Sequence, residues 1–171
     1  MSDEQQKDES WRGKVGRMSE EECVSFFDEG PLCRLGCHDE DGWPYVVPIW
    51  FLYKDGGYYL IPRERSAWAR YLDNDERVYL TIDEPGSLRK VMVKGTARKI
   101  EGPNVGGKWV GLAEEMSTRY LGPDGPKYLV PTLHEPRWLF FVEPIKTTTW
   151  QGVDWAPKYK HSEWGEAKKG E

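Results

Sequence analysis

The sequence lacks the features that would place it in a membrane or outside the cell. Its longest apolar run, residues 45–53, has nine residues with a proline among them, whereas a membrane-spanning helix needs about 20. The N-terminus carries Asp3, Glu4, Asp8 and Glu9 and has neither the basic nor the apolar region of a signal peptide. The three cysteines cannot all pair within the chain, which is typical of a reducing compartment. We therefore predict a cytoplasmic protein with no membrane partner.

Positive charge and catalytic motifs are also scarce. The 29 acidic residues outnumber the 24 basic ones, which argues against a nucleic-acid partner held by general positive charge. The GxSxG, HExxH, P-loop and GxGxxG motifs are absent. Cys33 and Cys37 share one strand face while His38 points the other way, so we predict no metal site. Chemistry is therefore expected from a bound cofactor, and no side chain is assigned as catalytic.

The chain of 171 residues is long enough for one domain, since a single core typically takes about 100 to 200 residues. Residues 1–17 are polar without periodicity and predict a flexible arm, residues 18–150 the domain, and residues 151–171 a tail that could contribute to the active site. A capping box, Ser19 to Glu22, predicts a helix ending near Asp28. Strands are expected over residues 32–38, 45–53, 58–62, 77–83, 89–101, 137–142 and 145–150, and further helices over 66–72 and 108–120.

Six or seven short strands with small helices predict a mainly β fold. The strands are expected to pair antiparallel, because they are separated by short turn-forming tracts such as residues 39–42 and 54–57. A closed or half-closed barrel is favoured because closure removes exposed strand edges.

Basic residues are concentrated between residues 61 and 100, a stretch that contains nine basic and six acidic residues. Within this stretch Arg63, Arg65 and Ser66 lie between the end of a strand and the start of a helix, where free N–H groups favour an anion. Two guanidinium groups and a hydroxyl would complete a phosphate site. The alternative is that Ser66 only caps the helix and the arginines are solvated, and the spacing alone does not separate the two.

Nine tryptophans in 171 residues are an excess that a flat ligand would explain. An indole offers a stacking face and one N–H donor. A binding site walled by indoles and joined to a phosphate site would take a flat, phosphorylated heterocycle. For any one tryptophan, packing in the core is the alternative.

Four stretches resemble the flavin-binding split-barrel family that is similar to pyridoxamine 5′-phosphate oxidase: DGWPYVVPIW at 41–50, RSAWARYL at 65–72, NDERVYL at 74–80 and RKVMVKGTA at 89–97. The resemblance implies an antiparallel split β-barrel of six to seven strands. It assigns the isoalloxazine ring to Val47, Ile49 and Trp50. It assigns the ribityl phosphate to Ile61, Pro62, Arg63, Arg65 and Ser66. Trp68 stands on the same stretch, where the family often has a basic residue, and Lys90 falls where the family places a polar group, often across a dimer interface.

The resemblance implies a homodimer that binds FMN and transfers a hydride between the flavin and a small-molecule substrate. The arginine-rich signature of true pyridoxamine-phosphate oxidases is not visible at residues 149–155, so oxidation of vitamin B6 is not predicted. Two alternatives remain open. One is the deazaflavin F420 on the same fold, and the other is a non-catalytic flavin-binding or haem-binding protein, with His38 as the haem ligand.

Overall fold

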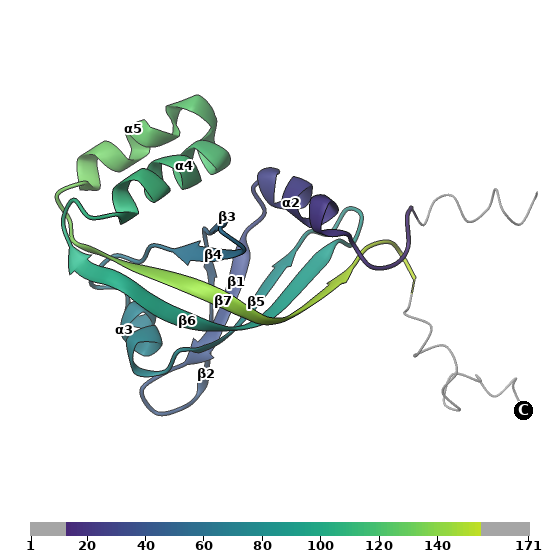
Figure 1. The fold of residues 1–171 in the computed structure, drawn as a ribbon, viewed down its shortest axis with the longest axis horizontal. Helices are drawn as coiled ribbons and strands as arrows, with labels where there is room; N and C mark the ends of the chain where they lie inside the picture. The colour runs from purple at the N-terminus through teal and green to yellow at the C-terminus, as the bar shows by residue number, and fades with distance from the viewer. Residues whose placement is uncertain (1–12, 155–171) are drawn as a thin grey trace, which may run out of the picture.

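The computed structural model describes residues 13–154, which form a mainly β domain (Figure 1). Seven strands make one antiparallel sheet in the order β2-β1-β5-β6-β7-β4-β3, which confirms the predicted antiparallel fold. The sheet has two edges, β2 and β3. The strands are β1 (Cys33–His38), β2 (Pro44–Ile49), β3 (Leu52–Lys54), β4 (Gly57–Leu60), β5 (Arg77–Asp83), β6 (Lys90–Asn104) and β7 (Arg137–Trp150).

Four α-helices accompany the sheet within the described residues. The predicted capping box is present, since Ser19 Oγ accepts from the Glu22 N–H at 3.2 Å and the Glu22 carboxylate accepts from the Ser19 N–H at 2.8 Å. No helix between residues 13 and 154 is both long enough and apolar enough to cross a membrane. The helices are α2 (Glu20–Asp28), α3 (Ala67–Asn74), α4 (Trp109–Leu121) and α5 (Gly125–Leu129), with the 3-10 helices η2 (Gly122–Asp124) and η3 (Val130–Thr132) around α5.

The predicted arm and tail fall mostly outside the described residues, which exclude 1–12 and 155–171. Where the described chain begins and ends, Gly16 and Gln151 form an antiparallel bridge with N···O distances of 3.0 and 2.8 Å. The two ends of the described chain therefore lie side by side.

The single strand predicted over residues 45–53 is wrong, because the chain leaves the sheet at Trp50 and Phe51. The Phe51 N–H donates to the Tyr120 hydroxyl at 3.3 Å, and the Phe51 carbonyl accepts from the Arg119 guanidinium. Both partners come from α4, so the backbone groups of Phe51 are satisfied outside any ladder. The break sends β2 and β3 to opposite edges of the sheet and leaves Trp50 between them.

The two last strands predicted on either side of Pro144 are one strand, β7. Proline has no N–H to donate and is tolerated in a strand where that side needs no partner. The pairing of β7 with β4 ends at Val142, and beyond it β7 continues beside β6 alone. Pro144 therefore lies where one edge of β7 is free. β6 likewise runs past its predicted end at Glu101 to Asn104, with shifts of register.

Two hydrophobic clusters hold the domain together. The larger one fills the space between the sheet, α2 and α3, and contains Phe26, Phe51 and Leu80. The smaller one lies under α4 and α5 around Trp109, whose indole N–H donates to the Asn104 carbonyl at 3.0 Å. Figure 1 shows α4 and α5 together at one end of the sheet, near the ends of β6 and β7. The insert between β6 and β7 thus has a core of its own.

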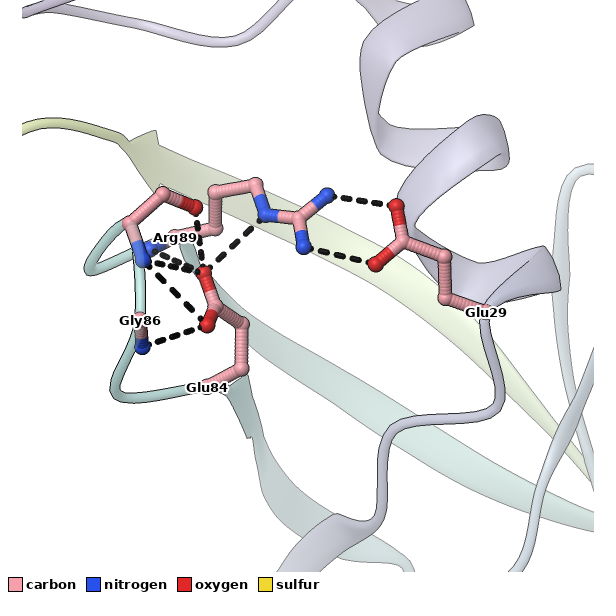
Figure 2. A network of polar contacts seen from close by, with 5 residues as sticks. Glu29, Glu84, Gly86 and Arg89 are labelled. Atoms are coloured by element: carbon pink, nitrogen blue, oxygen red, sulfur yellow. Dashed lines mark hydrogen bonds and ion pairs between the residues drawn. The ribbon is translucent and has the colours of Figure 1, made fainter. Parts of the chain in front are cut away.

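A polar network, which we call the Arg89 clamp, ties α2 to the turn between β5 and β6 (Figure 2). The Arg89 guanidinium donates to the two Glu29 oxygens at 2.7 and 2.6 Å and to Glu84 at 3.1 Å. Glu84 also accepts from the Gly86 N–H at 2.6 Å and from the Ser87 hydroxyl. These contacts lower the pKa of Glu84 to about 2. The hydrogen bond from the Ser87 hydroxyl lowers it most, and the hydrogen bond from the Arg89 side chain is the next largest cause that lowers it. The clamp joins segments about 55 residues apart around one cation.

Candidate functional site

A cavity of about 420 Å³ opens between the two hydrophobic clusters. We call it the main cavity. Its volume falls within the range of about 300 to 1,000 Å³ typical of small-molecule sites. β2, the segment after β4, the start of α3 and the insert of α4 and α5 all contribute to its wall. The lining residues are Pro48, Ile49, Trp50, Ile61, Pro62, Arg63, Ser66, Trp68, Ala113, Met116, Tyr128, Leu129 and Arg137.

One wall of the main cavity is the turn that leads from β4 into α3. Ser66 is the N-cap of α3, and its extended backbone places it just before the first helical turn. Its hydroxyl makes no capping hydrogen bond, in contrast to Ser19 at the start of α2. The Ser66 N–H donates to the Arg63 carbonyl at 3.0 Å, which closes the turn. The hydroxyl at the positive end of the α3 dipole is thus left for another acceptor or donor.

Arg137 reaches the same wall from β7, because Arg63 and Arg137 form an antiparallel β-bridge. The Arg137 side chain is buried, with 8% of the residue exposed. Its Nη2 donates to the Thr132 hydroxyl at 2.9 Å, and its Nε has no hydrogen-bond partner among the described residues. Burial lowers the pKa of Arg137, and the charge of Arg63 lowers it further. A buried cationic donor without an acceptor is costly unless an anion supplies one.

Negative charge at this wall comes from Glu135. Its Oε2 lies 3.2 Å from Arg63 Nη1 and 3.7 Å from Arg65 Nη2. The Glu135 charge opposes the shift of the Arg137 pKa, but by less than Arg63 contributes to it. The Glu135 carboxylate therefore pairs with the guanidinium groups of Arg63 and Arg65, and the guanidinium group of Arg137 lies nearby. Three positive charges and one negative charge leave this region with an excess of positive charge.

The rest of the main cavity's lining is largely apolar and aromatic. The Trp50 ring stacks on Tyr120 at 4.6 Å and 10°, and it lies 5.5 Å from the Tyr128 ring. Tyr120 is itself fixed by its hydroxyl, which donates to the Pro31 carbonyl at 2.9 Å. Met116 and Trp68 add further apolar surface. A ligand that fills the cavity would have an anionic group and a flat apolar part.

The strand β2, which lines the main cavity with Pro48 and Ile49, offers backbone groups as well. β2 pairs with β1 and is an edge strand, so its outer N–H and C=O groups have no partner strand. Pro44 and Pro48 both lie on it, and proline is typical of edge strands. The edge of β2 can therefore give hydrogen bonds to a flat ligand lying along it.

The structure brings seven of the ten predicted site residues to the main cavity. Val47 faces the larger hydrophobic cluster instead. The Arg65 side chain is 76% exposed and does not line the cavity. Lys90 is exposed and pairs with Asp83 of β5 and Trp150 of β7, so within one chain it is separated from β2 by two strands. The seven are Ile49, Trp50, Ile61, Pro62, Arg63, Ser66 and Trp68.

Several lining residues were not predicted from the sequence. Arg137 begins a strand 71 positions after Ser66, and only the pairing of its backbone with Arg63 brings it to the cavity. Met116 and Ala113 look like ordinary positions on the inner face of a helix, and α5, which carries Leu129 and follows Asp124, was not expected at all. No local signal in the sequence marks these residues.

His38 lies outside the main cavity, on β1. Its Nδ1 is 3.3 Å from an oxygen of Asp75, and its side chain is 40% exposed. Among residues 13–154, no group of three His, Cys, Asp or Glu side chains could hold a metal ion.

Comparisons with known proteins agree on the fold. Residues 19–137 match the family model described as pyridoxamine 5′-phosphate oxidase, whereas no curated protein sequence matches the chain. The structure is similar to that of a conserved hypothetical protein from Mycobacterium tuberculosis, with 25% identity and a TM-score of 0.67 over 83% of this chain and 89% of that one. Two similarities are of fold alone. An F420 reductase has 20% identity and a TM-score of 0.60 over 72% and 94% of the chains. A FAD-binding protein from Mesorhizobium loti has 18% identity and a TM-score of 0.58 over 82% and 98%.

Proposed function

The chain belongs to the pyridoxamine 5′-phosphate oxidase family, and from that premise we propose that it is an oxidoreductase that binds FMN and acts on a small organic substrate. The main cavity supports this proposal, because its lining offers groups that match the two chemical parts of FMN. A phosphate requires cationic donors, and an isoalloxazine ring requires a flat apolar slot.

The observation that carries the proposal is the unpartnered Arg137 Nε beside Arg63. Arg63 and Arg137 repel each other, and the Glu135 carboxylate, which pairs with Arg63, offsets this only in part, so a second anion would stabilise the pair. A phosphate oxygen would accept the Nε–H that no described residue accepts. The Ser66 hydroxyl, which makes no capping bond, would donate to a second oxygen. The residues present therefore fit a phosphate monoester.

The remaining contacts of the cavity would hold the ring. Ile49 and Trp50 would lie along one side of it, next to the unpaired edge of β2, and Met116 of α4 would exclude water from the other side. When bound, FMN would supply hydride transfer to or from the substrate. The protein contributes orientation, exclusion of water and positive charge, and no described side chain is assigned as a proton donor.

The binding test compares FMN with riboflavin, which carries the same ring and lacks the phosphate. A charge-assisted hydrogen bond contributes about 1.5 to 3 kcal/mol, so FMN should bind about 10 to 150 times more tightly than riboflavin. Quenching of flavin fluorescence on titration measures both affinities. Equal affinities would overturn the phosphate site.

Turnover is tested separately on the FMN-loaded protein, with NADPH as donor and menadione as acceptor. Steady oxidation of NADPH above the rate given by the same concentration of free FMN supports an oxidoreductase. Tight FMN binding with no such excess, also with NADH, would favour storage of the cofactor instead.

A second candidate cofactor is the deazaflavin F420, and one observation favours it. Positive charge extends beyond the cavity, because Arg65 is exposed and shares Glu135 with Arg63. A longer anionic tail would reach Arg65, whereas the single phosphate of FMN would not need it. Arg65→Ala should therefore weaken F420 binding severalfold and leave FMN binding unchanged. Flavin absorbance bands in protein purified from a host without F420 would favour FMN.

We also propose a homodimer, on the basis of the apolar surface on the outer face of the sheet. Val46 is 65% exposed, Tyr79 is 47% exposed, and both flank Gly36 in one cross-strand row. Apolar surface gathered on a sheet face is typical of an interface. The resemblance to the family implies that Lys90 of one subunit then lies near the main cavity of the other. A monomeric mass by light scattering would remove that role of Lys90.

A further inference from the structure

A second cavity, of about 370 Å³, lies under α2 and shares no lining residue with the main cavity. We call it the α2 cavity. Its walls come from α2 and the residues before it, from β3 and β4, and from the second half of β7, where β7 has lost its pairing with β4. It exists because α2 covers the opening between β3–β4 and β7 without filling it.

Aromatic rings make up the inner wall of the α2 cavity. Tyr58 is 2% exposed and packs against Tyr53 at 5.1 Å and Phe27 at 5.8 Å between ring centroids. Met18 and Val91 add apolar surface. Such a wall is typical of a site for a small flat molecule, since ligand pockets are mostly apolar with a few polar groups.

Two hydroxyls of the α2 cavity are already engaged. Ser19 Oγ is used by the helix cap, and Thr149 Oγ1 is used by the backbone of Met18 at 3.0 and 3.3 Å. The hydroxyls of Tyr53 and Tyr58, in contrast, make no hydrogen bond with any described residue. Neither oxygen is among the buried atoms that lack a partner, so both are accessible from the cavity. These two phenols, on neighbouring strands, are therefore donors open to a ligand.

The inner lining of the α2 cavity is uncharged. Burial is the first cause that raises the pKa of Tyr53, Tyr58 and Cys23, which all face it. The charged lining residues, Arg17 and Glu20, are both exposed and are of opposite sign, so their effects on a ligand charge oppose each other. A charged ligand would thus lose hydration against the aromatic wall with little net compensation.

From these contacts we propose that the α2 cavity is a second ligand site, which takes an uncharged aromatic molecule with a carbonyl oxygen. The ring lies against Phe27, Tyr53 and Tyr58, and the carbonyl accepts the hydrogen bond of the Tyr58 hydroxyl. The proposal is independent of the cofactor in the main cavity.

The test uses three probes of similar shape: acetophenone, ethylbenzene, which lacks the carbonyl, and benzoate, which is charged. Binding to the full chain is measured by ligand-observed NMR both without cofactor and with saturating FMN, so that binding in the main cavity is distinguished from binding in the α2 cavity. Acetophenone should bind about two- to tenfold more tightly than ethylbenzene, the range expected for one hydrogen bond, and benzoate should bind least. Equal binding of acetophenone and benzoate would overturn the proposal.

Tyr58→Phe keeps the ring and removes the hydroxyl, and it should bring the affinity for acetophenone down to that for ethylbenzene. The matched control is Tyr59→Phe, because Tyr59 is the next residue on β4 and its hydroxyl donates to Asp55 at 2.9 Å, outside the α2 cavity. Tyr59→Phe should leave acetophenone binding unchanged. If Tyr58→Phe also leaves it unchanged while thermal unfolding shows a folded protein, acetophenone binds without the Tyr58 hydroxyl and the proposal fails.

Discussion

Two arginine centres in this molecule use the same residue types in opposite proportions. In the Arg89 clamp one guanidinium faces two carboxylates, Glu29 and Glu84, and it also lies 4.5 Å from the Phe26 ring centroid. Beside the main cavity Glu135 pairs with Arg63 and Arg65, and the buried Arg137, which lines the cavity, keeps an unpartnered Nε. A cation whose donors are satisfied within the chain holds the fold together. A buried cation with a donor to spare indicates a site for an anion.

The largest expected effect is on stability and comes from Arg89→Met. This change removes a partly buried cation and leaves two carboxylates without their partner. Because the Arg89 side chain is only 23% exposed, the loss should lie between those of exposed and buried pairs, at about 2 to 4 kcal/mol. Urea unfolding measures it, and FMN affinity should not change. The control is Arg98→Met, since Arg98 is exposed on β6. If both variants lose equally little stability, the clamp is not structural.

Arg137→Met should show the opposite pattern. FMN affinity should fall about 10- to 150-fold, corresponding to a lost charge-assisted bond, and the preference for FMN over riboflavin should disappear. The free energy of unfolding of the cofactor-free protein should stay within about 1 kcal/mol or rise, because a buried cation is replaced by an apolar side chain of similar length. A large loss of stability with unchanged FMN affinity would make Arg137 a structural residue like Arg89.

The clamp should also respond to acid. The pKa of Glu84 is lowered from 4.5 to about 2, so the folded state favours the charged carboxylate. The stabilisation is complete above pH 4.5 and is lost as the pH falls from 4.5 toward 2. The difference in unfolding free energy between the wild type and Glu84→Gln should therefore shrink over that interval. A difference that stays constant from pH 7 to pH 2.5 would contradict the assignment.

How far the sequence predicts these features depends on whether they are local. The capping box at Ser19 and Glu22 and the alternating strand at 77–83 depend on neighbours a few residues away, and both were predicted with their bounds nearly correct. The break at Phe51 depends on Arg119 and Tyr120, about 70 positions along the chain. A continuous apolar run cannot reveal that its backbone groups have partners in a distant helix.

The site residues also differ in whether their position depends on local or on distant parts of the chain. The turn from Arg63 to Ser66 is a local motif and was predicted, whereas Arg137 reaches the cavity only through the pairing of two distant segments. Arg63 and Arg65 are two positions apart in this motif. The motif alone does not show that the Arg65 side chain is exposed to solvent while Arg63 lines the cavity. The choice between these arginines is made by the strand geometry and not by residue type.

The smallest expected effects come from two serines that occupy equivalent positions in α2 and α3. Ser19→Ala should lower the free energy of unfolding by about 1 kcal/mol, because its hydroxyl caps α2, and FMN affinity should not change. Ser66→Ala should leave stability nearly unchanged, since the Ser66 hydroxyl does not cap α3, and should weaken FMN binding about two- to tenfold through one lost hydrogen bond. Urea unfolding and FMN titration on both variants separate the two roles. If Ser66→Ala behaves like Ser19→Ala in both measurements, Ser66 is a helix cap and the phosphate site depends on arginines alone.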